Sequence, residues 1–245
     1  MGLGFLSART GEKIRNLPVA GIHGTGRGMS WSPDGKLIAH AGLDAERRCG
    51  IFIGTVATGE VKLLVPQEDA ASNLTWSADG KNLAYHYRGD VYVVNIADGQ
   101  PRRLTSSTER EGDRGTRSFS HPVFAPNGGS VAYVAASGQK ADTVMATTID
   151  GQQTREIFHA KDGQSINVFD WSPDGRHIVF TPGNKEIWCV ATAGGEPFPI
   201  ADISNLGEEA WAWWPEWSPK GDAIIFGVIN EKYKYCVMED FLPEE

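Results

Sequence analysis

One five-residue pattern, an aromatic residue followed by a tight-turn sequence that ends in Gly, occurs five times and constrains the fold more than any other feature. Its first copy is Trp31-Ser32-Pro33-Asp34-Gly35. The aromatic residues of successive copies are 45, 48, 47 and 46 residues apart. Self-similarity at such a period indicates a repeat architecture in which each repeat packs on the next. The anchors of the repeats are Trp31, Trp76, Phe124, Trp171 and Trp217.

Every repeat has the same order of short β-strand-like segments. A first strand ends on the aromatic residue, and a second, apolar strand follows the turn, as at residues 37–40. A third strand rich in β-branched residues covers 51–55, and a second Gly turn at 57–60 leads into a fourth strand. Helical periodicity is lacking, which excludes a helical solenoid. The pattern therefore predicts an all-β protein, a β-propeller of four-stranded antiparallel blades.

The repeated pattern itself has structural reasons at every position. Its Gly supplies the positive φ of a hairpin turn, its Pro presets the turn, and its Asp bonds the nearby backbone. Strand alternation directs the aromatic ring to the face that packs between neighbouring blades. We therefore expect these residues to build the fold rather than to carry chemistry.

The two ends of the chain each resemble part of a blade, and together they do not match one blade cleanly. Residues 3–17 resemble the second half of a blade, while the last repeat, from Trp217 onward, has room for three strands. A strand at residues 12–17 that completes the last blade would remove an exposed sheet edge. We therefore favour a single domain over residues 1–245, five-bladed with terminal strand closure. An incomplete six-bladed ring and a fragment of a longer protein are the alternatives, since closure leaves the third-strand copy at 3–7 unused.

The charge and composition of the chain limit the classes of partner that it is expected to bind. The formal net charge of −8 gives no general attraction to nucleic acid or anionic lipid. No stretch is long enough for a membrane span, so no membrane insertion is expected. The N-terminus lacks a secretory signal, which indicates a cytoplasmic protein if this end is native and a periplasmic or secreted one if a leader has been removed. The cysteines Cys49, Cys189 and Cys236 lack metal-type spacing and are expected to be unpaired thiols.

The Trp-Ser-Pro-Asp-Gly repeats resemble those of the TolB-like, WD40-like β-propeller family over residues 3–241. The third copy departs most, with Phe124 and Asn127-Gly128 in place of Trp and Asp-Gly. The resemblance implies the propeller fold. Propeller domains of prolyl-oligopeptidase-type enzymes share this repeat, but the chain has no Gly-x-Ser-x-Gly motif and no room for a hydrolase domain. An autonomous peptidase is therefore excluded.

Loop lengths point to one end of the blades as the binding face. The loops at residues 19–28, 105–121 and 201–215 lead into blades and are long, whereas the turns at the opposite end are minimal. Long loops on a rigid scaffold commonly carry binding. Arginines on this face form the first candidate cluster, which either attracts a carboxylate-bearing partner or is neutralised by neighbouring acidic residues. They are Arg27, Arg47, Arg48, Arg88, Arg114 and Arg117.

Aromatic and histidine residues add two further clusters. Alternation in the run 211–217 places Trp211 and Trp213 with the core anchor and leaves Trp214 and Glu216 on the other side. Trp214 is thus the candidate exposed anchor. The histidines that approach this face are His23, His121, His40 and His86. They lack a metal motif, and His40 takes a position that other repeats fill with Tyr or Phe, so a core role is favoured and no metal or cofactor is expected.

Three functions follow from these features. The leading interpretation is a non-catalytic TolB-like propeller that binds a protein or peptide partner through its long-loop face, with a small anionic ligand as a further partner class. The second is a metal-dependent lyase or hydrolase of small anionic carbohydrates, based on the Arg and His residues. The third is a sensor module or propeller fragment of a longer protein.

Overall fold

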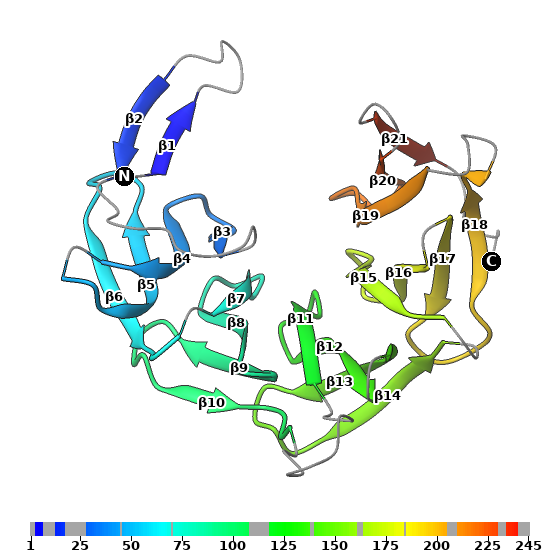
Figure 1. Cartoon of the computed structure of the whole chain (residues 1–245), viewed down its shortest axis with the longest axis horizontal. Coiled ribbons are helices and arrows are strands. Elements are labelled where there is room, and N and C mark those ends of the chain that lie inside the picture. The colour runs from blue at the N-terminus through cyan, green and yellow to red at the C-terminus, as the bar shows by residue number, and fades with distance from the viewer. Residues whose placement is uncertain are drawn as a thin grey trace. The chain divides into compact units, whose positions relative to one another are not determined.

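The computed structural model describes residues 3–6, 13–17, 28–44, 46–69, 71–107, 118–137, 140–160, 164–183, 185–204, 210–229 and 234–239. They form antiparallel β-sheets that follow one another along the chain (Figure 1). The chain divides into two compact units, residues 1–106 and residues 107–245. The described residues include no helix with the length and hydropathy of a membrane span. The all-β prediction is confirmed, and the single domain over 1–245 stays a prediction.

The first unit begins with a two-stranded sheet and continues with two four-stranded blades. The two-stranded sheet pairs β1 (Leu3–Leu6) with β2 (Lys13–Leu17). Blade 1 contains β3 (Met29–Trp31), β4 (Leu37–Leu43), β5 (Cys49–Thr55) and β6 (Val61–Pro66). Blade 2 contains β7 (Ser72–Trp76), β8 (Asn82–Tyr87), β9 (Asp90–Asn95) and β10 (Pro101–Arg103).

The second unit holds two four-stranded blades and a three-stranded one. Blade 3 contains β11 (Ser118–Phe124), β12 (Ser130–Ser137), β13 (Lys140–Thr148) and β14 (Thr154–His159). Blade 4 contains β15 (Ile166–Trp171), β16 (His177–Pro182), β17 (Glu186–Ala191) and β18 (Phe198–Asp202). Blade 5 contains β19 (Trp211–Trp217), β20 (Ala223–Ile229) and β21 (Lys234–Glu239). Each blade is a meander in which consecutive strands pair, as the repeat pattern predicts.

The pairing at the two ends of the chain is described within each unit. Among the described strands, blade 5 has three, and β2 pairs with β1. Closure of blade 5 by residues 12–17 would join the two units and stays a prediction. A hairpin between segments close in sequence closes a short loop and costs little entropy. The pairing also accounts for the surplus third-strand copy at residues 3–7, because β1 and β2 match the third and fourth strands of a blade.

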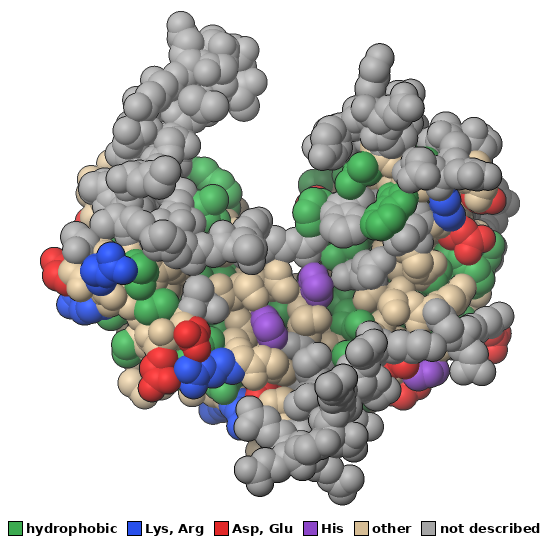
Figure 2. Space-filling view, viewed as in Figure 1, with side chains coloured by type: hydrophobic (Ala, Val, Ile, Leu, Met, Phe, Trp, Pro, Cys, Tyr) green, Lys and Arg blue, Asp and Glu red, His purple; other side chains and the backbone are tan. Residues whose placement is uncertain are grey.

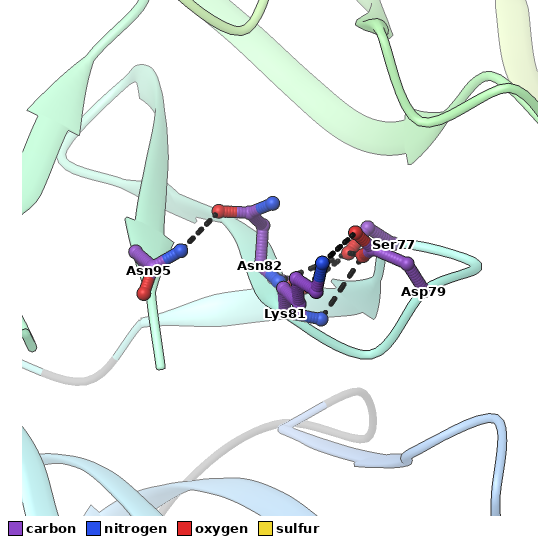
Figure 3. Close-up of polar contacts among 5 residues, drawn as sticks. All are labelled: Ser77, Asp79, Lys81, Asn82 and Asn95. Atoms are coloured by element: carbon purple, nitrogen blue, oxygen red, sulfur yellow. Dashed lines mark hydrogen bonds and ion pairs between the residues drawn. The ribbon is translucent and has the colours of Figure 1, made fainter. Parts of the chain in front are cut away.

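A hydrogen-bonded cluster of side chains holds the repeated turn together, as blade 2 shows (Figure 3). The buried Ser77 hydroxyl donates to Asp79 Oδ1 at 2.6 Å and accepts the backbone N–H of Asn82 at 2.9 Å. Asp79 Oδ1 also accepts the backbone N–H of Lys81 at 3.0 Å. Gly80 closes the turn at φ 68°, a value that favours glycine. The Ser and Asp of the pattern therefore satisfy backbone groups that the turn would otherwise leave unpaired.

The same cluster recurs in blades 1 and 4, through Ser32 with Asp34 and Ser172 with Asp174. The N–H of Lys36 and the hydroxyl of Ser32 lower the pKa of Asp34 to about 2. Blade 5 has Lys220 at the Asp position, and there Ser218 donates to Asp222 instead, at 2.7 Å. The turn chemistry is thus kept even where the pattern changes.

Apolar cores lie between adjacent blades within each unit. One cluster joins blades 1 and 2, and two others join blades 3 and 4 and blades 4 and 5. Trp76 is 7% exposed, and its indole Nε1 donates to the backbone oxygen of Ser30 in blade 1 at 3.0 Å. Trp171 and Trp217 are similarly buried. The interblade role predicted for the aromatic anchors is confirmed at these positions.

Trp31 departs from the expected burial. It is 53% exposed, and Met29 on the same strand is 50% exposed. Trp31 lies on β3, the first strand of the first four-stranded blade. Trp76 in blade 2 is covered by β3, but among the described strands no first strand of an earlier blade covers Trp31. Burial of this anchor therefore depends on the first strand of a preceding blade as well as on the motif.

Candidate partner-binding site

The strand order fixes which loops share an end of each blade. In an antiparallel meander, the loop that leads into the first strand lies at the same end as the loop between the second and third strands. In blades 1 and 2 these second loops are residues 44–48 and 88–89. Arg47, Arg48 and Arg88 therefore lie at the end predicted to bind a partner.

The arginines at this end are engaged by nearby carboxylates. Arg48 pairs with Asp44 at 2.6 Å and with Glu46 at 3.0 Å. Arg88 pairs with Asp69 and Glu68, and the hydrogen bond to Asp69 raises the pKa of Arg88 further above its usual range. Side chains coloured as basic and acidic lie beside one another over blades 1 and 2 (Figure 2).

These pairs support the self-neutralising alternative for Arg48 and Arg88, because a partner carboxylate would have to displace a local one. Arg47 adopts φ 62° in the same turn, and its N–H donates to the backbone oxygen of Asp44. The remaining predicted residues Arg27, Arg114, Arg117 and His23 lie outside the described residues.

The aromatic run of β19 contains a β-bulge that changes which side chains are exposed. The pairing of β19 with β20 shifts register between Trp213 and Glu216. Trp214 and Glu216 are exposed, Trp214 by 49%, as predicted. Trp211 is 44% exposed, so its predicted core position is wrong. The extra residue of a bulge reverses the alternation, and Ala212 takes the buried place expected for its neighbours.

The same bulge occurs at an equivalent place in blades 2 and 3. In each, the register shifts between the first strand and the second, directly before a residue with positive φ. That residue is Asn73 at 51° in blade 2, His121 at 54° in blade 3 and Trp214 at 48° in blade 5. The left-handed conformation costs a non-glycine residue roughly 1 kcal/mol, and such strain concentrates at functional sites.

The backbone geometry is thus the same at these three positions, but the side chains differ. In the Ser-Asp turns, by contrast, the side chains repeat together with the backbone geometry. A bulge re-aims a side chain away from the regular alternation. The Pro that follows His121 and Trp214 is a sequence signal that could have located the bulges of blades 3 and 5, because Pro cannot donate to the sheet ladder.

The histidines take separate structural roles. His121 is half-buried, and its Nδ1 lies 3.1 Å from the Ser120 hydroxyl. His86 Nδ1 lies 3.0 Å from the Ser72 hydroxyl, and burial lowers the pKa of His86. His40 is 1% exposed and stacks on Phe52 with ring centroids 5.1 Å apart, which confirms its predicted core position.

Burial lowers the pKa of His40 to about 4, so the ring is neutral near neutral pH. Over the described residues, no group of three or more His, Cys, Asp or Glu side chains has the arrangement of a metal site. Cys49 and Cys189 are free thiols, while Cys236 lies in β21, where side chains are not described. These histidines therefore act as separate packing and hydrogen-bonding groups.

Comparison with known proteins connects this architecture to other chains. The model for the dipeptidyl peptidase IV (DPP IV) N-terminal region matches residues 47–124. The Tol-Pal system protein TolB of Francisella tularensis subsp. holarctica is 25% identical over 242 residues, covering 78% of this chain and 54% of the relative. An uncharacterised protein of Agrobacterium fabrum is 30% identical over 139 residues, covering 56% of this chain and 42% of that protein.

A solved structure supports the fold. A proposed TolB from Agrobacterium tumefaciens superposes with a TM-score of 0.66 at 20% identity, over 94% of this chain and 80% of that one. Repeated four-stranded blades with interblade aromatic anchors define a protein of the β-propeller class. The chain is similar in sequence to TolB over most of its length, and its fold is a TolB-like β-propeller. It spans about half the length of the curated relatives it matches.

Proposed function

We propose that this TolB-like propeller is a non-catalytic scaffold that binds a protein or peptide partner at the loop end of its blades, with Trp214 and Trp211 as anchors. The observation that carries the proposal is the bulged strand β19. It exposes two tryptophans by 44% and 49% although the alternating pattern would bury one of them. Aromatic side chains are enriched among the residues that dominate binding energy at protein interfaces.

The surroundings of the tryptophans fit this role. Glu216 is exposed on the same strand and offers a carboxylate to a polar or basic group beside the aromatic anchors. Trp214 holds a left-handed backbone that a smaller residue would adopt as readily, so the large ring has a purpose other than backbone geometry. The Francisella relative is named a Tol-Pal system protein, and we carry over a role within a protein system as part of the proposal.

Site-directed photo-crosslinking tests the proposal. A benzophenone amino acid is placed at position 214, and a matched control carries it at Lys36, which is exposed in the turn at the opposite end of blade 1. Both proteins are irradiated in a lysate of cells that produce the chain natively. We expect a discrete protein adduct from position 214 that untagged wild-type protein competes away.

A second variant separates partner binding from folding. Trp211→Ala, combined with the crosslinker at position 214, should reduce the adduct about tenfold or more, the effect of losing an interface anchor worth at least about 1.4 kcal/mol. Circular dichroism and thermal unfolding confirm that the variant is folded. Equal adducts from positions 214 and 36, or an adduct unchanged by Trp211→Ala, would contradict the proposal.

A further inference from the structure

A cavity of about 410 Å³ lies between blades 3 and 4, away from the bulge of β19. Its walls come from β14 of blade 3 and from β16, β17 and the turn at residues 194–197 of blade 4. All of these elements belong to the second unit. The volume falls in the range of small-molecule sites, roughly 300–1,000 Å³.

The inner walls are apolar and fixed in place. Phe158, Ala160 and Phe180 are each at most 5% exposed, and the rings of Phe158 and Phe180 pack with centroids 4.3 Å apart. Trp188 lines the cavity as well, and its indole Nε1 donates to Glu186 Oε2 at 3.0 Å, which fixes the ring. A site with preformed apolar walls binds an apolar group without first having to order its own side chains.

Among the described residues that line the cavity, the side chain with a formal charge is acidic. Glu196 lines it and is exposed to solvent. His159 also lines it, with its Nδ1 2.8 Å from the Thr143 hydroxyl and 4.0 Å from Asp142 Oδ1. No Lys or Arg is among the described residues that line the cavity.

An arginine on β14, one of the strands that line the cavity, is held by another contact. Arg155 on β14 donates to the backbone oxygen of Thr192 at 2.9 Å, so its guanidinium joins the two blades instead of neutralising Glu196. Among the described lining residues, an organic anion would therefore meet the Glu196 carboxylate without a matching cation, whereas an ammonium group would pair with it.

We propose that this interblade cavity binds a small apolar organic cation, with the apolar body between Phe158, Phe180 and Trp188 and the ammonium group beside Glu196. Burial of the body against the aromatic walls supplies most of the affinity, since apolar surface leaves water. Pairing with Glu196 supplies the selectivity for positive charge. The site is independent of the proposed partner-binding strand β19, and either proposal can fail without the other.

Three probes of matched shape test the charge preference: phenethylammonium, the neutral 2-phenylethanol and the anion 3-phenylpropionate. The full chain is labelled with 5-fluorotryptophan, and Trp188→Phe identifies the fluorine resonance of Trp188 by its disappearance. We expect phenethylammonium to shift this resonance with saturation. It should bind about fivefold more tightly than the alcohol, the scale of a partly exposed ion pair, and the anion should bind most weakly.

Two carboxylate variants and one filling variant locate the site. Glu196→Gln should abolish the preference for the cation while leaving alcohol binding intact, and Glu156→Gln, an exposed carboxylate on β14 outside the cavity lining, should change neither. Ala160→Leu should weaken all three probes by filling the cavity. The proposal is overturned if no probe shifts the Trp188 resonance up to millimolar concentration, if the anion binds as tightly as the cation, or if Glu156→Gln matches Glu196→Gln.

Discussion

The carboxylate of Asp170 accepts the backbone N–H of Trp217 at 3.0 Å, although the two residues are 47 positions apart. Its other oxygen accepts the N–H of Trp171 at 2.9 Å. One side chain therefore joins the first strands of blades 4 and 5 beside both aromatic anchors. Desolvation by burial outweighs these two hydrogen bonds and raises the pKa of Asp170 to about 6.

Asp170→Asn should lower the free energy of unfolding by about 1–2 kcal/mol at pH 4.5, where the buried carboxyl group is uncharged, because the amide nitrogen cannot accept a hydrogen bond and leaves one N–H unpaired. Urea denaturation measures the loss. Glu156→Gln, an exposed carboxylate in the same unit, should change stability by less than about 0.5 kcal/mol. An Asn variant as stable as wild type would show that Trp217 N–H needs no partner.

Asp170 should also make the second unit more stable in mild acid. Its pKa in the folded protein lies above the ordinary value of 3.8, so its contribution is complete below about pH 3.8 and is lost as pH rises to about 6. The loss amounts to about 3 kcal/mol. Hydrogen exchange of residues 166–171 and 211–217 at pH 4.5 and 7 measures it, and Asp170→Asn should remove the difference. A wild-type protein without this difference would contradict the burial of the carboxyl group.

His40 should have the opposite effect on the first unit. Its pKa of about 4 lies below the ordinary 6.5, so stability is complete above about pH 6.5 and falls by about 3 kcal/mol as pH drops toward 4. Both ring nitrogens are buried without a partner among the described residues. His40→Phe, the residue type found at Phe180 and Phe226, should raise stability by about 1–3 kcal/mol at pH 7 and abolish the acid loss in residues 37–43. A destabilised Phe variant would indicate a buried partner for the imidazole.

Ser77→Ala should cost about 1–2 kcal/mol, because it removes two hydrogen bonds and leaves the Asn82 N–H unpaired. Lys81→Ala is the matched control, since its ammonium lies 3.9 Å from Asp79 in an exposed pair and should contribute less than about 0.5 kcal/mol. Thermal unfolding compares the two. Equal effects would mean that the surface ion pair, rather than the hydroxyl, holds the turn.

Ala78→Pro should stabilise the protein by about 0.4–1 kcal/mol. Ala78 takes the turn position that the other four repeats fill with Pro, and Pro restricts the unfolded chain where the folded backbone already suits it. Chemical denaturation measures the gain, with Ala57→Pro, in a turn whose other copies have no Pro, as the contrasting substitution. A loss of stability on Ala78→Pro would show that the backbone of this turn differs from its equivalents.

The turns and the strands could be predicted because their causes are local. Gly80 needs positive φ, and Ser77 and Asp79 bond backbone groups within five residues, so the five-residue pattern carries the whole explanation. The exposure of Trp211 could not be predicted in this way. The exposure of Trp211 depends on how β19 pairs with β20. The register shift between these two strands reverses which side chains of β19 are buried and which are exposed.

The sequence by itself determined the class of this protein. Each repeat of 45 to 48 residues has two Gly turns, and four antiparallel strands per blade is the arrangement in which the backbone groups of such a repeat are hydrogen-bonded. Tertiary structure decided which residues differ from their repeat equivalents. Three features depend on the packing of neighbouring sheets: the exposure of Trp31, the hydrogen bonds of Asp170 to two blades, and the cavity lined by Phe158. Contacts between blades join residues some 47 positions apart, and strand periodicity carries no information at that range.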